Sequence, residues 1–446
     1  MTAGNLWAGI WNISWPMFLI MIFNFLSGFI NIYAAGFISP TIQAALGFVE
    51  QLYFLIIIII NAINIGTIAL ISRAAGAGDH LRAVAVARQS LLFGGFSATV
   101  IMITGILFSR TIIAVAGFPP ETRDIASFFF RVFAIMLLPN AVLIISNAIF
   151  QASGEVKKPL LTMAFVTIVH IALLSLFVFG FLSFPSLGYQ GIAAATVLSI
   201  TAGMAVNLIL FSLTRWRAIY AFPPRTSLET MRRIAGLGWP VALLQVAWNA
   251  GSIILYNILG RLGDKSITAL ASITAGLRIE AIIYLPAFAL NMAASVLIGQ
   301  NLGAGNSGRA EETGWKIAKA GVVLMSSMAV IIFILAEPLA RILTNDPHVH
   351  AETVRYLRFN MLSEPFMALS VVLGGCLQGA GDTRGAMWVI VRAMWLIRLP
   401  LAYLLAIVLG YGAPGVWGAM VISMCVQGLL MTARFRSGRW KTVVVD

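Results

Sequence analysis

The chain has little charge: only 10% of its 446 residues are Asp, Glu, Lys or Arg, whereas 60% are hydrophobic. A soluble domain averages about 25% charged residues, so this composition excludes an ordinary soluble protein and indicates an integral membrane protein. Acidic residues are the scarcer kind, 16 against 29 basic ones. The basic residues are spread over short segments between apolar stretches, so their excess reports membrane orientation, and we expect no nucleic-acid partner.

Cysteine and histidine are also rare. The two cysteines, Cys376 and Cys425, lie in apolar runs and are expected to be small buried hydrophobic residues. The four histidines show no metal-ligand spacing, so we expect no metal site. The first apolar stretch lacks a basic leader and is long, so we expect a retained span rather than a cleaved signal peptide.

What the chain has in abundance is long apolar stretches, and twelve of them are long enough for the about 20 residues that a bilayer requires. They cover 13–36, 48–72, 89–114, 126–149, 160–182, 190–213, 238–260, 270–297, 317–342, 359–379, 387–410 and 415–435. Six lie on each side of an arginine-rich segment. The sequence therefore predicts an all-α membrane protein with an N-lobe (1–213), a cytoplasmic linker (214–237) and a C-lobe (238–446).

The two halves repeat one another. Residues 71–83 (ISRAAGAGDHLRA) share six identities with residues 298–310 (IGQNLGAGNSGRA), and residues 151–155 (QASGE) resemble residues 378–382 (QGAGD) at the same offset of 227. Because six spans is an even number, both halves enter the membrane in the same sense, and the repeats are parallel.

The glycines of the repeated GAG elements predict tight helix stops with a positive φ. Asp79 or Asn306 could then cap the helix that follows. A role of these turns in gating is the alternative.

The distribution of basic residues predicts the orientation. If the N-terminus is cytoplasmic, 18 of the 29 basic residues fall on cytoplasmic segments and 8 on outer ones. This bias favours both termini inside a cytoplasmic (inner) membrane.

Ionisable groups inside a bilayer are costly and are therefore candidates for function. Glu280 and Glu364 are the predicted ion-coupling residues, and Glu280 is the principal one because Glu364 lies near a span end that water could reach. Arg278 points about 200° away from Glu280 around the helix and cannot pair with it. A permanent ion pair of Glu280 with Arg392 or Arg398 is the alternative to coupling.

Polar side chains recur at helical spacing within the predicted spans, with matched stripes in the first and seventh. These stripes are predicted to line a substrate cavity, and hydrogen bonding between helices is the alternative. The predicted cavity residues are Asn24, Asn31, Gln245, Asn249, Tyr256, Tyr284, Asn291 and Arg398. Pro16, Pro240 and Pro286 are predicted helix kinks near the substrate, or static bends needed for packing.

With these motifs in view, the chain resembles the prokaryotic multidrug and toxic compound extrusion (MATE) transporters. The resemblance covers nearly the whole chain and rests on SRAAGAGD (72–79), GQNLGAGN (299–306), LQGAGDT (377–383), RIEAIIYLPAF (278–288) and IRLPLAY (397–403). It implies an exporter whose two six-helix lobes rock between inward-open and outward-open states, driven by entry of protons or sodium.

The chain departs from the family at the usual coupling residues. Many members have an aspartate fifteen residues after the proline of the first span, where this chain has Asn31, which cannot take up a proton. The acids that sodium-binding members use in the seventh and tenth spans correspond here to Trp248 and Met367, the latter one turn from Glu364. Glu280 is the best remaining acid.

We therefore expect a secondary active antiporter that exports amphipathic small molecules or drugs in exchange for protons or sodium. It would act as a monomer in lipid, and we expect no enzymatic activity and no cofactor beyond the coupling ion. The nearest rival is a flippase for a lipid-linked precursor, which would need a basic cavity. A membrane enzyme and a channel are further rivals, but the chain offers neither a catalytic cluster nor a filter sequence.

Overall fold

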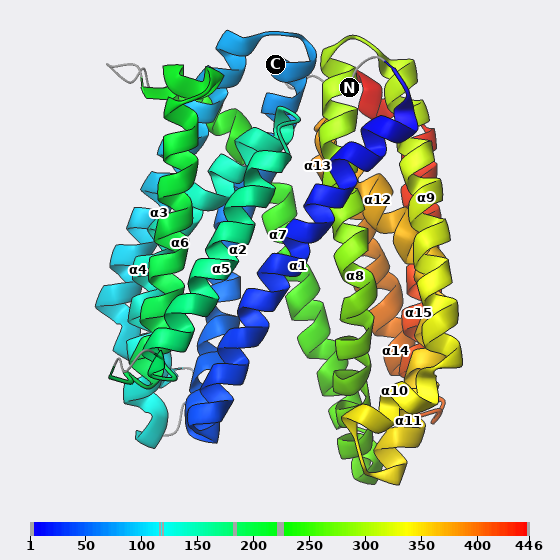
Figure 1. The fold of residues 1–446 in the computed structure, drawn as a ribbon. Coiled ribbons are helices and arrows are strands. Elements are labelled where there is room, and N and C mark those ends of the chain that lie inside the picture. The colour runs from blue at the N-terminus through cyan, green and yellow to red at the C-terminus, as the bar shows by residue number, and fades with distance from the viewer. Residues whose placement is uncertain (1–3, 116, 118–119, 182–184, 221–226, 444–446) are drawn as a thin grey trace. The chain divides into compact units, whose positions relative to one another are not determined.

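The computed structural model describes residues 4–115, 117, 120–181, 185–220 and 227–443. Helices account for nearly all of these residues, and none of them lies in a strand (Figure 1). The first half contains α1 (Leu6–Ile38), α2 (Pro40–Gly76), α3 (His80–Val115), α4 (Pro120–Ala152), α5 (Lys157–Phe177), α6 (Tyr189–Ser212) and the 3-10 helix η2 (Arg215–Tyr220). The second half contains α7 (Leu228–Gly260), η3 (Gly263–Lys265), α8 (Ser266–Gly303), α9 (Ser307–Ile334), α10 (Ala336–Leu343), α11 (Pro347–Met361), α12 (Glu364–Ala380), α13 (Thr383–Arg392), η4 (Ala393–Arg398), α14 (Leu399–Tyr403), η5 (Leu404–Val408), α15 (Ala413–Arg436) and η6 (Arg439–Thr442).

Eleven helical segments of the described chain are long and apolar enough to cross a membrane, and the bent pair α11 and α12 makes a twelfth. The chain is therefore a multi-pass, all-α membrane protein, and the predicted fold class is confirmed. The helices extend several residues beyond many predicted span ends, because polar first and last turns do not register as apolar sequence.

The tenth span is bent, so the prediction of one helix over 359–379 is wrong. α11 ends at Met361, α12 begins at Glu364, and the two meet at an angle of 55°. Pro365 lies in the first turn of α12. A proline is tolerated there but not inside a helix, where it removes a backbone hydrogen bond, so the chain ends one helix and starts another.

The eleventh span changes helix type along its length. Between the α-helical segments α13 and α14, residues 393–398 form a π-helix, and residues 404–408 form a second one. Pro400 lies two residues after the end of the first π segment and has no N–H for an α-helical bond. Single π turns inside α-helices are rare and occur often at functional sites, which directs attention to Arg398 at the end of the first one.

The glycines of the GAG elements end their helices as the sequence predicts, with a positive φ at Gly78 (73°) and Gly305 (75°). The glycines of the second repeated element, Gly154 (84°) and Gly381 (88°), do the same, which was not predicted from the sequence. In each turn the N–H of the following residue bonds the carbonyl five residues earlier, at 2.8–3.0 Å, which is the Schellman helix stop.

The predicted caps after these turns have different outcomes. The carboxylate of Asp79 accepts a 2.9 Å hydrogen bond from the N–H of Arg82, as predicted. Asn306 makes no such bond at the start of α9, so the prediction for that residue is wrong.

Contacts divide the chain into two compact units, residues 19–238 and residues 1–18 with 239–446. Helices α1 and α7 each contribute residues to both units. The predicted boundaries of the lobes and the linker were drawn from the sequence repeat, whereas the compact units are defined by contacts. Those boundaries therefore stay a prediction.

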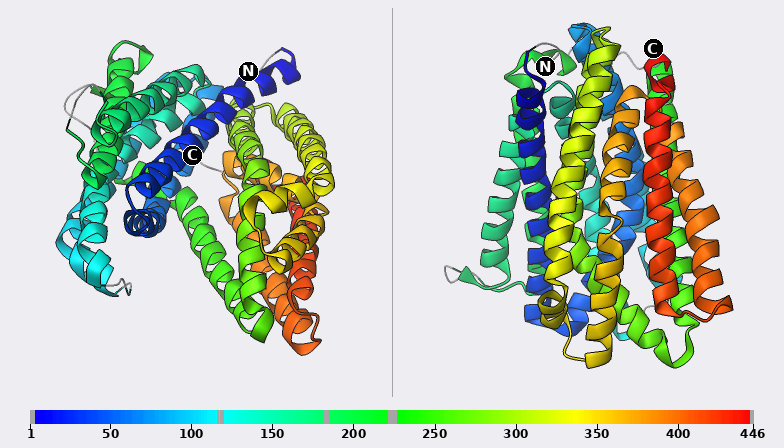
Figure 2. Two further views of the ribbon diagram at one scale, coloured as in Figure 1. Left: turned by 60° about the horizontal axis from the view of Figure 1, so that its bottom comes forward. Right: turned by 90° about the vertical axis from the view of Figure 1, so that its right-hand side faces the viewer.

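Within the first unit, α2, α3 and α4 pack on one another, α4 also packs on α6, and α6 on α5. In the second unit, α8 packs on α9, α11 and α12, and α12 packs on α9 and on α15. The right-hand view of Figure 2 shows this unit from the side. Glycines allow the closest approaches: a Cβ at Gly375 or Gly379 of α12 would collide with the backbone of Asn291 or Ser295 of α8.

Candidate ion-coupling site

Glu280 is buried in the second unit, with 2% of its surface exposed. It lies in α8, where small and apolar neighbours give the helix a nearly uniform hydrophobic surface. One carboxylate oxygen accepts a 2.9 Å hydrogen bond from the hydroxyl of Tyr284, one turn further along. The other oxygen has no hydrogen-bond partner among the described residues, so the carboxyl group is only partly satisfied.

A second acid, Glu364, interacts electrostatically with Glu280 from the start of α12. It is 3% exposed, and one of its carboxylate oxygens also lacks a hydrogen-bond partner within the described chain. The expectation that water could reach Glu364 is therefore wrong. The bend between α11 and α12 places this helix start inside the packed unit.

The buried tyrosine Tyr356 of α11 completes this side of the cluster. Its hydroxyl interacts with the Glu280 carboxyl but does not meet hydrogen-bond geometry with any described group. Its ring packs edge-on against Trp417, with centroids 4.8 Å apart. Sequence reasoning missed Tyr356 because it lies outside the predicted spans; its buried face on α11 is the signal that could have found it.

Arg398 supplies the positive charge. It is 4% exposed, its Nε donates a 2.8 Å hydrogen bond to the hydroxyl of Ser423, and its guanidinium lies 5.1 Å from the centroid of the Trp248 ring. It interacts with Glu280 through Coulombic attraction, but the described residues contain no direct ion pair between the two. Arg392 is exposed and lies over the ring of Trp388 instead.

The charges of this cluster do not balance. The buried carboxyl groups of Glu280 and Glu364 interact with each other, and Glu280 also interacts with the one buried guanidinium, so full ionisation leaves one net negative charge in a low-dielectric interior. Burying an uncompensated charge costs several kcal/mol, and a shared proton or a bound cation removes that cost. The cluster can therefore bind one proton or one monovalent cation. No group of three or more His, Cys, Asp or Glu side chains in the described chain could hold a metal ion.

Several side chains of the predicted polar stripes make hydrogen bonds to backbone carbonyls. The side-chain amides of Asn24 and Asn249 donate to carbonyls one turn earlier, Ile20 and Gln245, at 2.9 and 2.8 Å. Asn291 donates to the carbonyl of Val371 at 2.7 Å and so joins α8 to α12.

The remaining stripe residues are only partly exposed. Tyr256 packs against the hydrophobic core of its unit, and the side chain of Gln245 is half-buried. A cavity lined by these residues stays a prediction. Pro16, Pro240 and Pro286 lie inside α1, α7 and α8, and their role as kinks also stays a prediction.

Asn31 belongs to a buried cluster in the other unit. Its Oδ1 lies 3.0 Å from Nε2 of His170 in α5 and 3.4 Å from the hydroxyl of Thr196 in α6. His170 is 2% exposed. Sequence reasoning considered the histidines only as metal ligands and missed this one. A histidine in the middle of an apolar span is the signal that could have found it.

Two further features of that unit have modest roles. Glu50 of α2 is half-buried and was overlooked as an acid inside the predicted span 48–72.

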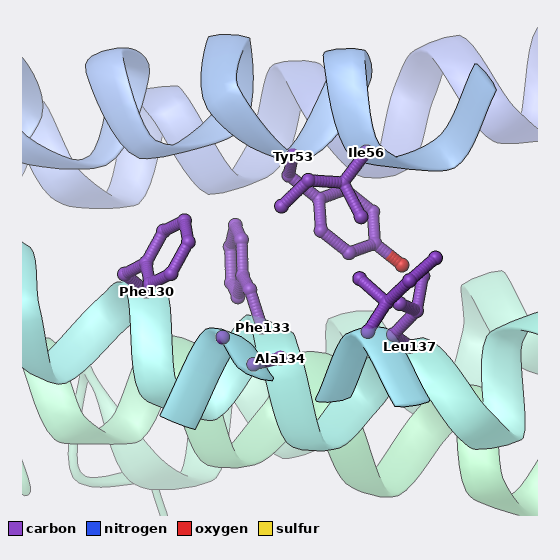
Figure 3. A pocket seen from close by; sticks show the side chains of 8 residues that line it. Tyr53, Ile56, Phe130, Phe133, Ala134 and Leu137 are labelled. Atoms are coloured by element: carbon purple, nitrogen blue, oxygen red, sulfur yellow. The ribbon is translucent and has the colours of Figure 1, made fainter. Parts of the chain in front are cut away.

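The gap between α2, α3 and α4 is lined by rings of Tyr53, Phe130 and Phe133, which face one another in Figure 3. Its free volume of about 10 Å³ is no more than one water needs, so it is no substrate site.

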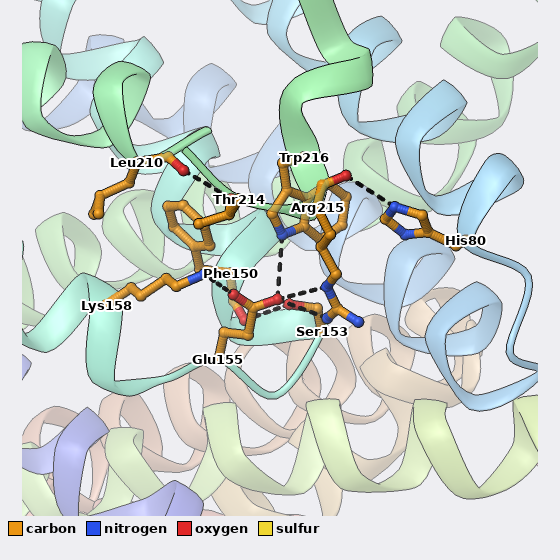
Figure 4. A network of polar contacts seen from close by, with 9 residues as sticks. All are labelled: His80, Phe150, Ser153, Glu155, Lys158, Leu210, Thr214, Arg215 and Trp216. Carbon is orange, nitrogen blue, oxygen red and sulfur yellow. Dashed lines mark hydrogen bonds and ion pairs between the residues drawn. The ribbon is translucent and has the colours of Figure 1, made fainter. Parts of the chain in front are cut away.

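A polar network ties the loops at one end of the same unit. Glu155 accepts hydrogen bonds from Lys158, from Arg215 at 2.7 Å and from the indole of Trp216 at 3.3 Å, while His80 contacts the carbonyl of Arg215 (Figure 4). Burial acts to raise the pKa of Glu155, but the bonds and charges of Lys158 and Arg215 outweigh it and hold that pKa below its ordinary value.

Both halves of the chain match one known protein family. The family described as MatE matches residues 16–176 and again residues 240–404, so each half matches once, as the internal repeat predicts. Together the two matches cover well over half of the chain.

Individual relatives match over most of their length. The probable multidrug resistance protein NorM of Thermotoga maritima is 24% identical over 91% of this chain and 87% of its own. The uncharacterized transporter YisQ of Bacillus subtilis is 24% identical over 97% of this chain and 94% of its own. The solved structure of the Vibrio cholerae MATE transporter VcmN in the bent form superimposes with a TM-score of 0.89 at 20% identity, over 98% of both chains, which shows a shared fold.

Proposed function

We propose that this chain, which belongs to the MatE family of membrane transporters, is a secondary active antiporter that exports amphipathic small molecules. The name of the Thermotoga maritima relative, a probable multidrug resistance protein, supports this substrate class. Transport would proceed by rocking of the two lobes, in a cytoplasmic membrane with both chain termini inside, and the protein would act as a monomer.

The charge imbalance around Glu280 is the observation that supports ion coupling. Glu280, Glu364 and Arg398 are each more than nine-tenths buried, and the two acids outnumber the arginine. A proton or a sodium ion would neutralise the excess charge. A proton needs only one carboxylate oxygen, whereas sodium prefers several oxygen ligands, so we propose proton coupling first.

The alternative in which Glu280 is a permanent ion-pair partner has less support. Arg398 already donates to Ser423 and lies over Trp248, and Arg392 is exposed. The same occupancy of Arg398 argues against the flippase, whose pyrophosphate substrate would need free buried arginines.

One coupling ion is energetically sufficient. One charge that crosses a potential of about 100 mV supplies about 2.3 kcal/mol; at about 1.4 kcal/mol per tenfold concentration ratio, this supports roughly a 50-fold gradient of a neutral substrate.

The test is uptake of a fluorescent drug into inverted membrane vesicles, with a pH gradient or a sodium gradient imposed separately. We expect a pH gradient to drive uptake by the wild type, and Glu280→Gln to lose that uptake while keeping its yield in the membrane. Glu312→Gln is the matched control, because Glu312 is a surface acid paired with Lys316. Full pH-driven uptake by Glu280→Gln would contradict the proposal, and uptake driven by sodium alone would assign sodium as the coupling ion.

A further inference from the structure

One face of α8 carries a hollow that ends at an arginine. The hollow extends along α8 from Ile267 to Arg278, is also lined by Leu343 at the end of α10, and has a volume of about 520 Å³. Its lining positions on α8 recur every three or four residues and so share one helical face. Ala271 and Ala275 lie between larger neighbours, and their small side chains create the recess. Small-molecule sites have volumes of about 300–1,000 Å³.

Arg278 is the charged group of this hollow. It is exposed and has no hydrogen bond, ion pair or ring contact with any residue that the structure describes. The other two arginines within spans differ: Arg392 lies over Trp388, and Arg398 is bonded to Ser423. An arginine within a span is costly unless an anion or water satisfies it, so Arg278 is available to a ligand.

The nearest acid along the helix does not supply that anion. Glu280 lies about 200° from Arg278 around α8. It is buried on the opposite side of the helix and interacts with Arg398 instead. On α10, which contributes Leu343 to the hollow, the acid Glu337 is paired with Arg358.

The position of Arg278 along α8 selects the kind of anion. α8 has 38 residues, about 57 Å at 1.5 Å per residue, against a hydrocarbon core of about 30 Å. A helix of this length that is centred on the core would extend about 13 Å beyond it at each end. Arg278 lies twelve residues from the helix start, about 18 Å, and would then lie just inside the hydrocarbon boundary, with the rest of the hollow between it and the near membrane surface.

This polarity is the reverse of what a phospholipid requires. A phospholipid places its tails toward the bilayer centre and its charge toward the surface. A ligand of this hollow would direct its charge inward to Arg278 and its apolar body toward the surface. An amphipathic organic anion that enters from the aqueous side fits this arrangement, and one guanidinium suits one carboxylate or sulfonate, which it binds in a bidentate manner.

We propose that the Arg278 hollow binds amphipathic organic monoanions, with the carboxylate or sulfonate on Arg278 and the apolar body along Ala271 and Ala275. This inference rests on the proposed transport function, because it names a substrate class for that transport. The binding itself needs no ion gradient.

The experiment compares two probes that share a dye and differ in charge: dansyl-glycine, a carboxylate, and dansyl-glycinamide, its neutral amide. Binding to the purified full chain in phosphatidylcholine nanodiscs is measured by fluorescence anisotropy. We expect the wild type to bind the carboxylate at least about tenfold more tightly, since a charge-assisted hydrogen bond contributes about 1.5 kcal/mol or more. Arg278→Gln should remove this preference, and Arg278→Lys should restore part of it.

Three controls locate the effect. Arg392→Gln should keep the wild-type preference, and Arg278→Gln should still bind the amide as the wild type does, which shows that it is folded. Ala275→Leu, which fills the recess, should weaken both probes. Equal affinities in the wild type, a preference that persists in Arg278→Gln, or loss of the preference in Arg392→Gln would overturn the proposal.

Two further measurements complete the experiment. The first distinguishes a free organic anion from a lipid headgroup, and the second distinguishes this proposal from the proposed antiport. Added phosphatidylglycerol should leave dansyl-glycine binding unchanged; competition would assign the hollow to a lipid headgroup and overturn the proposal. Glu280→Gln should bind both probes as the wild type does. Failure of ion-driven uptake together with an intact Arg278-dependent preference would therefore refute the proposed antiport alone.

Discussion

The hydroxyl of Tyr284 donates a 2.9 Å hydrogen bond to one carboxylate oxygen of Glu280, one turn earlier in α8, while the second oxygen has no partner among the described residues. The bond fixes the orientation of the carboxyl group and leaves one oxygen open to a proton or a cation. The pair thus combines a structural contact with an unsatisfied group, which is the combination that a coupling residue needs.

This bond predicts a specific double-mutant result. Tyr284→Phe should lower the free energy of unfolding by about 1–2 kcal/mol, because it removes the only hydrogen bond described for the Glu280 carboxyl. In a Glu280→Ala background the same change should cost almost nothing. Thermal unfolding of the four proteins in detergent measures the cycle. Equal costs of Tyr284→Phe in the two backgrounds would mean that the hydroxyl acts elsewhere.

Arg398 predicts a charge-balance result. Arg398→Gln should destabilise the protein by on the order of 3 kcal/mol, because it removes the counter-charge of Glu280, which also interacts with the buried carboxyl group of Glu364. Adding Glu364→Gln should recover much of that loss. Arg392→Gln, at an exposed position, should change stability by less than about 0.5 kcal/mol. No recovery in the Arg398→Gln, Glu364→Gln double variant would separate Glu364 from the cluster.

Two adjacent glycines of α12 test the packing against α8. A Cβ at Gly375 would collide with the backbone of Asn291, whereas a Cβ at Gly374 would only touch the methyl group of Met431, at 3.8 Å. Gly375→Ala should therefore destabilise the protein by about 1–3 kcal/mol. Gly374→Ala should be neutral, or stabilising by up to about 1 kcal/mol, because alanine favours helices. Fluorescence-detected size-exclusion chromatography after heating ranks the variants, and equal melting of the two would mean that α12 and α8 are not in close contact.

Glu155 predicts a pH-dependent stability. Its pKa in the folded protein lies below the ordinary value of 4.5, so ionised Glu155 stabilises the fold. This contribution is complete above the unfolded-state pKa and is lost as the pH falls through the folded-state pKa. Glu155→Gln should therefore cost on the order of 1 kcal/mol at pH 7, and the difference from the wild type should vanish in strong acid.

The control for this prediction is Glu312→Gln, which removes an exposed ion pair on the surface of α9. It should change the melting temperature little at either pH. A cost of Glu155→Gln that is the same at pH 7 and at pH 3 would show that its charge has no part in the network of Figure 4.

Local signals in the sequence were sufficient for much of the fold. Runs of apolar residues predicted the spans, and Gly78 and Gly305 predicted helix stops, because glycine adopts a positive φ without steric cost. The cap at Asp79 was predicted for the same local reason. The break before Pro365 was missed because the apolar pattern continues across it.

The candidate site was harder to predict because its members come from separate elements, α8, α11, α12, η4 and α15. Glu280 was found by its charge within an apolar span. The partners Tyr356 and Ser423, and the pairing of Asn31 with His170, depend on how distant helices pack, which no local pattern encodes. The π-helical segment that ends at Arg398 also depends on tertiary packing, so its special place was not visible in the sequence.

The most direct test of the central claim is proton movement in proteoliposomes loaded with a pH-sensitive dye. When a transported drug is added on one side, the wild type should move protons in the opposite direction in proportion to drug flux. Glu280→Gln, at equal reconstituted amounts, should move neither. Proton movement by Glu280→Gln that matches the wild type would contradict the account, because it would show that the buried carboxyl cluster of α8 and α12 is not where the coupling ion binds.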